Sequence, residues 1–165
     1  MSPIKSVVNQ LVKKHGTNDP FKLAQLMGIL IVFEPLGTAL GYYNKNFRVP
    51  IIHINQDAPK EKQFFICAHE LGHAVQHPDI NTSFLRQNTL FYTDILEIEA
   101  NTFAVELLLL DEYYYEQNPT SFTIIEAIES YGIPSELLTL KSLDDKKFNQ
   151  KQNIHSLSKG VLPNN

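Results

Sequence analysis

Three residues on one predicted helix carry the strongest chemical signal in this sequence of 165 residues. His69 and His73 are four positions apart, so their imidazoles lie on one side of the helix, about 40° from each other. Two imidazoles at this spacing can bind one Zn²⁺ ion. Glu70 lies about 100° further round the helix, where its carboxylate can take a proton from a water molecule on the metal. This H-E-x-x-H pattern therefore predicts a hydrolytic zinc site.

A catalytic zinc site needs a third ligand from the protein. His77 is followed by a proline, and we interpret it as the residue that ends the helix. Cys67 points away from the histidine pair and is expected to be a buried apolar residue. A later helix contains Glu97 and Glu99 in a strongly apolar sequence, where a carboxylate is costly unless it is paired or bound to metal. Because that helix is apolar on most sides, its pattern leaves both carboxylates open as the third ligand.

Capping residues and apolar periodicity predict the elements that position these residues. A helix is expected to begin at the N-cap Asp57 and to run to about residue 77, and it carries the H-E-x-x-H pattern. The other predicted helices cover residues 3–15, 20–27, 93–109, 124–131 and 135–140. Predicted strands cover residues 29–33, 40–43 and 49–54, with a hairpin turn at 44–46. Helices, a small sheet and further helices in this order indicate an α+β fold.

The small sheet is expected to have about three antiparallel strands and to pack on the helical core that holds the metal helix. In the third strand, Ile52 and Ile54 share one face and His53 lies on the other. This strand directly precedes the metal helix, so we expect it to be an edge that pairs with an extended substrate. Peptide hydrolysis also needs a donor for the oxyanion. The candidates by chemistry alone are Tyr42, Tyr43, His53 and Tyr92.

The composition indicates one soluble globular domain. The chain is 43% hydrophobic and 19% charged, and its net charge of −4 argues against a nucleic-acid binder with a basic surface. A single cysteine excludes an internal disulfide. The sequence has no secretion signal and no apolar segment of membrane-spanning length, so a cytoplasmic location is expected. Residues 1–141 are expected to form the domain, and residues 142–165 a polar, flexible tail.

The charges are unevenly distributed along the chain. Residues 87–140 contain ten Asp and Glu residues and no Lys or Arg. Such a stretch commonly represents nothing more than solvated helix faces. The alternative is an acidic surface that attracts a basic partner.

Two segments resemble the ImmA/IrrE family of metallo-endopeptidases: CAHELGHAVQH at 67–77 and EIEANTFAVELLL at 97–109. Shorter segments at 16–20, 28–29, 40–43 and 131–134 resemble the family as well, so the similarity covers roughly residues 15–140. The resemblance implies a zincin-like domain with His69 and His73 as zinc ligands and Glu70 as the general base. It also implies that the third ligand is Glu99, the glutamate of the E-A-N segment.

The resemblance further implies a class of substrate. Family members from phages and mobile elements act as antirepressors that cleave a helix-turn-helix repressor, and others cleave a similar regulator in stress responses. We therefore expect a zinc-dependent endopeptidase whose partner is such a repressor, without direct contact to nucleic acid or membrane. The alternative is a zinc-stabilised regulator that binds its repressor without cutting it. Glu70 favours the enzyme, because a purely structural zinc site has no need of a base.

Overall fold

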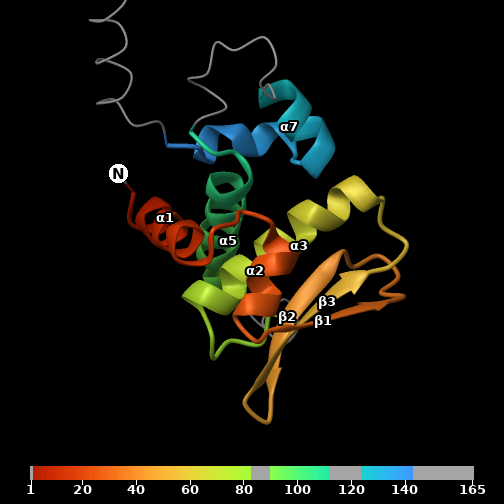
Figure 1. Ribbon diagram of the computed structural model, residues 1–165. Helices are drawn as coiled ribbons and strands as arrows, with labels where there is room; N and C mark the ends of the chain where they lie inside the picture. The colour runs from red at the N-terminus through yellow and green to blue at the C-terminus, as the bar shows by residue number, and fades with distance from the viewer. Residues whose placement is uncertain (1, 83–89, 112–123, 143–165) are drawn as a thin grey trace, which may run out of the picture.

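The computed structural model describes residues 2–82, 90–111 and 124–142, except the side chains of residues 90–93 and 124. The chain begins with helices α1 (Pro3–His15) and α2 (Pro20–Leu26), followed by strands β1 (Leu30–Glu34), β2 (Gly41–Asn46) and β3 (Val49–Asn55). Helices α3 (Lys60–Gln76), α5 (Leu90–Leu108) and α7 (Ile124–Tyr131) and the 3₁₀ helix η1 (Ser135–Leu140) follow (Figure 1). This order confirms the predicted α+β class.

The first two helices begin at the predicted capping residues. The Ser2 hydroxyl accepts a hydrogen bond from the backbone N–H of Lys5 at 3.1 Å, and Gly16 ends α1 with a φ of 69°. The Asp19 carboxylate accepts a hydrogen bond from the backbone N–H of Phe21 at 2.9 Å. These side chains satisfy N–H groups that have no partner inside the helix, and glycine adopts the positive φ without strain.

The sheet has the strand order β1-β3-β2, and its pairing is mixed. β2 runs antiparallel to β3, as expected, but β1 runs parallel to it. The hairpin places β2 on one side of β3, so β1 pairs with the other side, where its direction matches that of β3. The expectation of a wholly antiparallel sheet is therefore wrong for β1. The expectation that β3 is an edge is also wrong, because β3 is the central strand.

The hairpin turn lies at Phe47 and Arg48 rather than at the predicted segment 44–46, whose residues stay in β2. Both turn residues have positive φ values, of 48° and 69°. A two-residue hairpin turn of this kind requires such values and usually takes Asn or Gly. Asn44 and Asn46 favour a turn by their residue type. The register is instead set by the buried Tyr43, which lies opposite Ile52.

Helix α3 begins later than the predicted cap at Asp57. Pro59 directly precedes its first residue, whereas Asp57 lies in the turn after β3 and donates its backbone N–H to Asn55 Oδ1 at 3.0 Å. The helix ends with His77 as its C-cap residue, which confirms the interpretation of His77 as a helix-end residue. Helix α5 covers 90–108 instead of 93–109, and the last predicted helix is a 3₁₀ helix.

Helix α3 packs on the sheet with one side and on α5 with another (Figure 1). Ile52 and Ile54 of β3 are fully buried, and the alternation of the strand places His53 on the other face, as predicted. Towards α5, a Cβ atom at Gly72 would lie 3.1 Å from both the Cα and the carbonyl oxygen of Ala100. The glycine thus brings the two helix backbones into close contact, and this contact fixes which side chains meet between them.

A buried charge cluster joins α1 to the end of the described chain. Lys5 Nζ donates a hydrogen bond to Asp111 Oδ1 at 2.8 Å and lies 3.9 Å from Glu106 Oε2. Lys141 Nζ lies 2.6 Å from Glu106 Oε2 and 2.9 Å from Asp111 Oδ1. Glu106 also accepts hydrogen bonds from the backbone N–H and the hydroxyl of Ser142. Two lysines balance two carboxylates, which compensates the cost of burying these charges.

Of the expected tail, residues 142–165, the structure describes Ser142, and residues 143–165 lie outside the described residues. In the part of the chain that the structure describes, no helix combines the length and the apolar character that crossing a membrane requires.

Candidate metal centre

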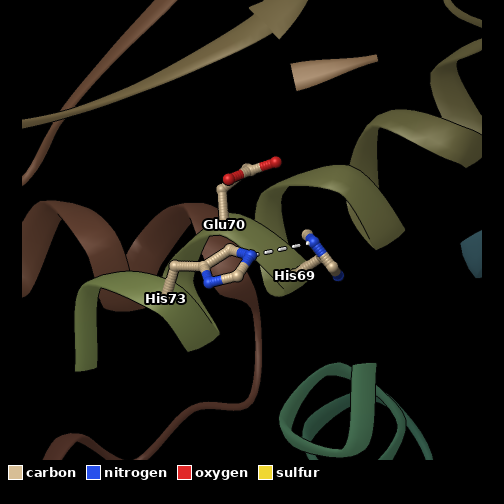
Figure 2. Close-up of side chains that lie close together, drawn as sticks. All are labelled: His69, Glu70 and His73. Carbon is tan, nitrogen blue, oxygen red and sulfur yellow. Dashed lines mark hydrogen bonds between the residues drawn. The ribbon is translucent and has the colours of Figure 1, made fainter. Parts of the chain in front are cut away.

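Helix α3 brings the three residues of the H-E-x-x-H pattern together. His69 Nε2 and His73 Nε2 are 3.2 Å apart (Figure 2). His69, Glu70 and His73 are all buried, and their potential ligand atoms lie within 4.8 Å of one another. Figure 2 shows Glu70 beside the histidine pair, on the side that faces the strands. The structure therefore brings together the three residues that were predicted to act as two metal ligands and a general base.

Glu97 of α5 adds a third donor group to this pair. Its Oε2 lies 3.2 Å from His69 Nε2, and its Oε1 lies 3.5 Å from His73 Nε2. Glu97 is three residues before Ala100, where the backbones of α3 and α5 are in close contact. Donor atoms from two helices therefore converge on one point.

Glu99 lies elsewhere. Its Oε2 is 3.0 Å from His77 Nε2, and the structure does not bring it to His69 or His73. The structure thus places Glu97 where the sequence analysis expected Glu99. Two residues apart on a helix means about 200° apart around it, so the two carboxylates cannot face the same histidine pair. The deciding feature is the close contact of Gly72 with Ala100, which the sequence pattern alone does not specify.

The donor atoms fit a tetrahedral zinc ion. Zn–N and Zn–O bonds of roughly 2.0–2.1 Å place neighbouring ligand atoms about 3.3–3.4 Å apart. The Nε2–Nε2 distance of 3.2 Å and the Glu97 distances of 3.2 and 3.5 Å lie close to this value. Two imidazoles and one carboxylate are also a common catalytic zinc set, which leaves one coordination position for water or substrate.

Asn101 orients one of the histidines. Its Oδ1 lies 2.8 Å from His69 Nδ1. An amide oxygen only accepts hydrogen bonds, so Nδ1 carries the hydrogen and Nε2 keeps its lone pair for a metal. Asn101 had no predicted role of its own. Its position four residues after Glu97, on the same side of α5, is the signal that could have identified it.

Carboxylates determine the direction of the pKa shift at His69, whereas burial determines it at His77. Burial opposes protonation of His69, but Glu97 and Glu70 outweigh it and raise the pKa of this imidazole above its ordinary value. At His77 burial prevails over the attraction of Glu99, and the pKa is lowered. Burial also raises the pKa of the Cys67 thiol, which agrees with its predicted role as an inert core residue. The centre is thus suited to a cation.

A cavity of about 340 Å³ opens onto the cluster. One wall is formed by residues 38–41, and the other by α3 and α5, including His69, Glu70, Glu97 and Asn101. At Gly41, a Cβ atom would lie 2.6 Å from Ile66 Cγ2 and 3.5 Å from Glu70 Cγ, so glycine allows β2 to lie directly against α3. A concave, mostly apolar space with a few converging polar groups is typical of a substrate site.

The edge of the sheet beside this cavity is β2, not β3. Further along β2, the Thr82 hydroxyl accepts a hydrogen bond from the backbone N–H of Tyr43 at 2.9 Å and donates one to its carbonyl at 3.1 Å. Thr82 therefore occupies both backbone groups that Tyr43 presents at this edge. An extended segment cannot pair with β2 at Tyr43 unless Thr82 moves.

The predicted oxyanion donors lie away from the cavity where the structure describes them. Tyr43 is buried, and its hydroxyl donates to a backbone carbonyl at 2.9 Å. Tyr42 and His53 stack with ring centroids 4.2 Å apart on the opposite face of the sheet, where His53 Nδ1 lies 2.5 Å from Glu34 Oε1. The side chain of Tyr92 is outside the described residues.

A protein family and two known proteins are similar in sequence to the part of the chain that holds this centre. The family Peptidase_M78, described as the IrrE N-terminal-like domain, matches residues 24–142, which include α3 and α5. The chain is 41% identical over 145 residues to the uncharacterized immunity region protein 2 of Bacillus phage phi105, covering 87% of this chain and 92% of that protein. It is 31% identical over 159 residues to the metallopeptidase ImmA of Bacillus subtilis (strain 168), covering 94% of this chain and 93% of that protein.

Proposed function

Because this chain belongs to the Peptidase_M78 family, the IrrE N-terminal-like domain, we propose that it is a zinc-dependent endopeptidase that cleaves a helix-turn-helix repressor. The observation that carries the proposal is the convergence of His69, His73 and Glu97 on one point, with Glu70 beside it. The similarity to a metallopeptidase over most of both chains supports hydrolysis as the reaction.

The chemistry follows from the residues around that point. His69, His73 and Glu97 would hold a zinc ion, which would supply the Lewis acidity that lowers the pKa of water towards neutrality and polarises the scissile carbonyl. Glu70 takes a proton from the attacking water and passes it to the nitrogen of the leaving amine. Asn101 keeps His69 in the tautomer that the site requires.

The cavity favours cleavage inside a chain over removal of C-terminal residues. An enzyme that removes C-terminal residues needs a cation to hold the terminal carboxylate. No Lys or Arg is among the described residues that line the cavity. This lining supports the proposal of an endopeptidase over that of a carboxypeptidase.

The proposed substrate is a helix-turn-helix repressor encoded close to this protein, so that cleavage derepresses a phage, a mobile element or a stress regulon. The relative in phage phi105 is named an immunity region protein, which supports a role in the control of such an element. Among the described acidic residues between 87 and 140, the exposed ones complement the basic surface with which a repressor binds DNA; they are Asp94, Glu126, Glu129 and Glu136. These partners are cytoplasmic, and we propose the same location for this chain.

The test is to incubate the purified zinc-loaded chain with the helix-turn-helix regulator encoded beside its gene and to analyse the products by mass spectrometry. We expect cleavage at a defined bond, loss of cleavage with a chelator and recovery with zinc. Glu70→Gln should bind the same amount of zinc and leave the regulator intact. Full activity of Glu70→Gln would contradict the assignment of the base. A regulator that is bound and released from DNA but never cut would favour the non-catalytic alternative.

A further inference from the structure

Helix α5 exposes part of its apolar sequence to solvent. A helix that is apolar on nearly all sides is ordinarily surrounded by protein. In the C-terminal half, Phe103 and Leu107 are indeed fully buried. In the N-terminal half, however, Ile95 is 60% exposed and Ile98 is 54% exposed. Two large apolar side chains of this helix therefore face solvent.

Ile98 lies next to the wall of the cavity at the metal centre, and Ile95 lies next to Ile98. Glu97 and Asn101 line that cavity. Residues three or four apart are neighbours on a helix surface, so Asp94 adjoins Glu97, and Ile98 adjoins both Asp94 and Asn101. Ile95 adjoins Ile98 on the side that points away from the cavity. We call Asp94, Ile95 and Ile98 the α5 strip, which is continuous with the cavity wall.

The α5 strip is acidic as well as apolar. Asp94 is exposed at one end of it, and the sequence contains no Lys or Arg from residue 87 to residue 140. An apolar surface with an acidic border complements a surface that carries apolar side chains together with Lys or Arg.

We propose that the α5 strip docks an amphipathic, basic segment of the protein substrate. Apolar side chains of that segment cover Ile95 and Ile98, and a Lys or Arg pairs with Asp94. The segment is held beside the cavity while a separate part of the same substrate reaches the metal centre. This inference rests on the proposed function, and it supplies a source of selectivity for one protein outside the cavity itself.

The direct test measures binding without cleavage. In a Glu70→Gln background, the regulator encoded beside the gene is titrated against the chain with and without the double substitution Ile95→Ser and Ile98→Ser. Loss of two apolar anchors should raise the Kd at least about tenfold. Leu26→Ser is the matched control, because Leu26 is 57% exposed on another helix, α2, outside the acidic stretch, and its removal should leave the Kd unchanged. Asp94→Asn should weaken binding less and reduce its dependence on salt.

A cleavage assay with Glu70 in place separates this inference from the proposed function. The double variant should lose at least about tenfold more kcat/KM on the intact regulator than on a short fluorogenic peptide that spans the cleaved bond. Equal losses on both substrates, or an unchanged Kd in the binding test, overturn the docking role and leave the peptidase assignment standing. If the zinc-loaded wild type cuts neither substrate, the proposed function fails, and the Kd values of the uncut complex still decide the docking role.

Discussion

Glu97 and Glu99 differ by two positions and have different partners: Glu97 contacts His69 and His73, and Glu99 contacts His77. We predict that purified wild type holds about one zinc per chain and that Glu97→Gln loses most of it, because a neutral amide replaces the carboxylate ligand. Glu99→Gln is the matched control and should keep its zinc. Metal analysis after dialysis against a weak chelator measures the difference. Loss of zinc in Glu99→Gln alone would return the third-ligand role to Glu99.

Asn101 acts on the metal through His69, so its removal should weaken binding without abolishing it. Substitution of such an outer partner lowers metal affinity by roughly 10–100-fold. We expect a reduction in this range for Asn101→Leu, which cannot accept the hydrogen bond from His69 Nδ1. Asn101→Asp retains an accepting oxygen and should remain close to wild type. Competition with a chromogenic chelator measures both affinities, and equal affinity of the leucine variant and the wild type would contradict the role.

The H-E-x-x-H residues were predictable from sequence, because they depend only on the geometry of one helix. The choice of Glu97 was not, because it depends on how α5 rotates against α3, and Asn101 can be identified from its spacing only once Glu97 has been chosen. That rotation is fixed by the contact of Gly72 with Ala100 and by the burial of Phe103. Both depend on residues that are far apart in the sequence. When a helix is apolar on nearly all sides, its periodicity does not indicate how it rotates against its neighbour.

At the scale of elements, the separation of α3 and α5 should control the metal centre. A Cβ at Gly72 would lie 3.1 Å from backbone atoms of Ala100, which cannot rotate away. We predict that Gly72→Ala lowers zinc affinity, because it moves Glu97 away from the histidines. The gain in helix propensity, about 1 kcal/mol, should offset much of the loss in stability. Chelator competition and urea unfolding of the metal-free protein measure the two effects separately.

Gly132→Ala provides the matched comparison for that prediction. Gly132 has a φ of +60°, and a Cβ there would lie 2.7 Å from the backbone nitrogen of Lys62, at the N-terminal end of α3. We expect this variant to lower the free energy of unfolding, by roughly 1–2 kcal/mol for the strained backbone alone, and to leave zinc affinity unchanged. If both glycine variants reduce zinc affinity equally, the α3–α5 separation is not the controlling distance.

The helices were easier to predict than the sheet. Ser2, Asp19 and Gly16 act within one turn of their own helices, so the ends of α1 and the start of α2 follow from local chemistry. The order and direction of the strands depend on which side of β3 stays unpaired after the β2–β3 hairpin has formed. The parallel pairing of β1 depends on that free side, and the turn at Phe47 follows from the register that buries Tyr43 opposite Ile52; neither has a local signal.

For the whole molecule, the buried charge cluster links α1, the end of α5 and Ser142. Burial alone would raise the pKa of Asp111, but hydrogen bonds from Lys5 and Lys141 outweigh it and hold the pKa below its ordinary value. A carboxyl group whose pKa is lower in the folded state stabilises the fold above its unfolded-state pKa. That contribution is lost as the pH falls through the folded-state pKa.

This linkage predicts a specific effect of Asp111→Asn. The wild type should exceed the variant in free energy of unfolding by a constant amount between pH 7 and about pH 5, and the difference should shrink below about pH 4. Urea unfolding at pH 7, 5 and 3.5 measures it. A difference that is the same at all three pH values would show that the carboxylate charge of Asp111 does not stabilise the fold.

The two edges of the sheet are unequal, and this has a consequence for how the protein behaves at high concentration. At β2, Thr82 already occupies the backbone groups of Tyr43. At β1, the other edge, Leu30 and Phe33 are exposed. An exposed apolar edge strand is a template for pairing with another chain. Aggregation during refolding or storage should therefore begin at β1. The substitution Leu30→Lys should delay aggregation more than a substitution to lysine in β2 does.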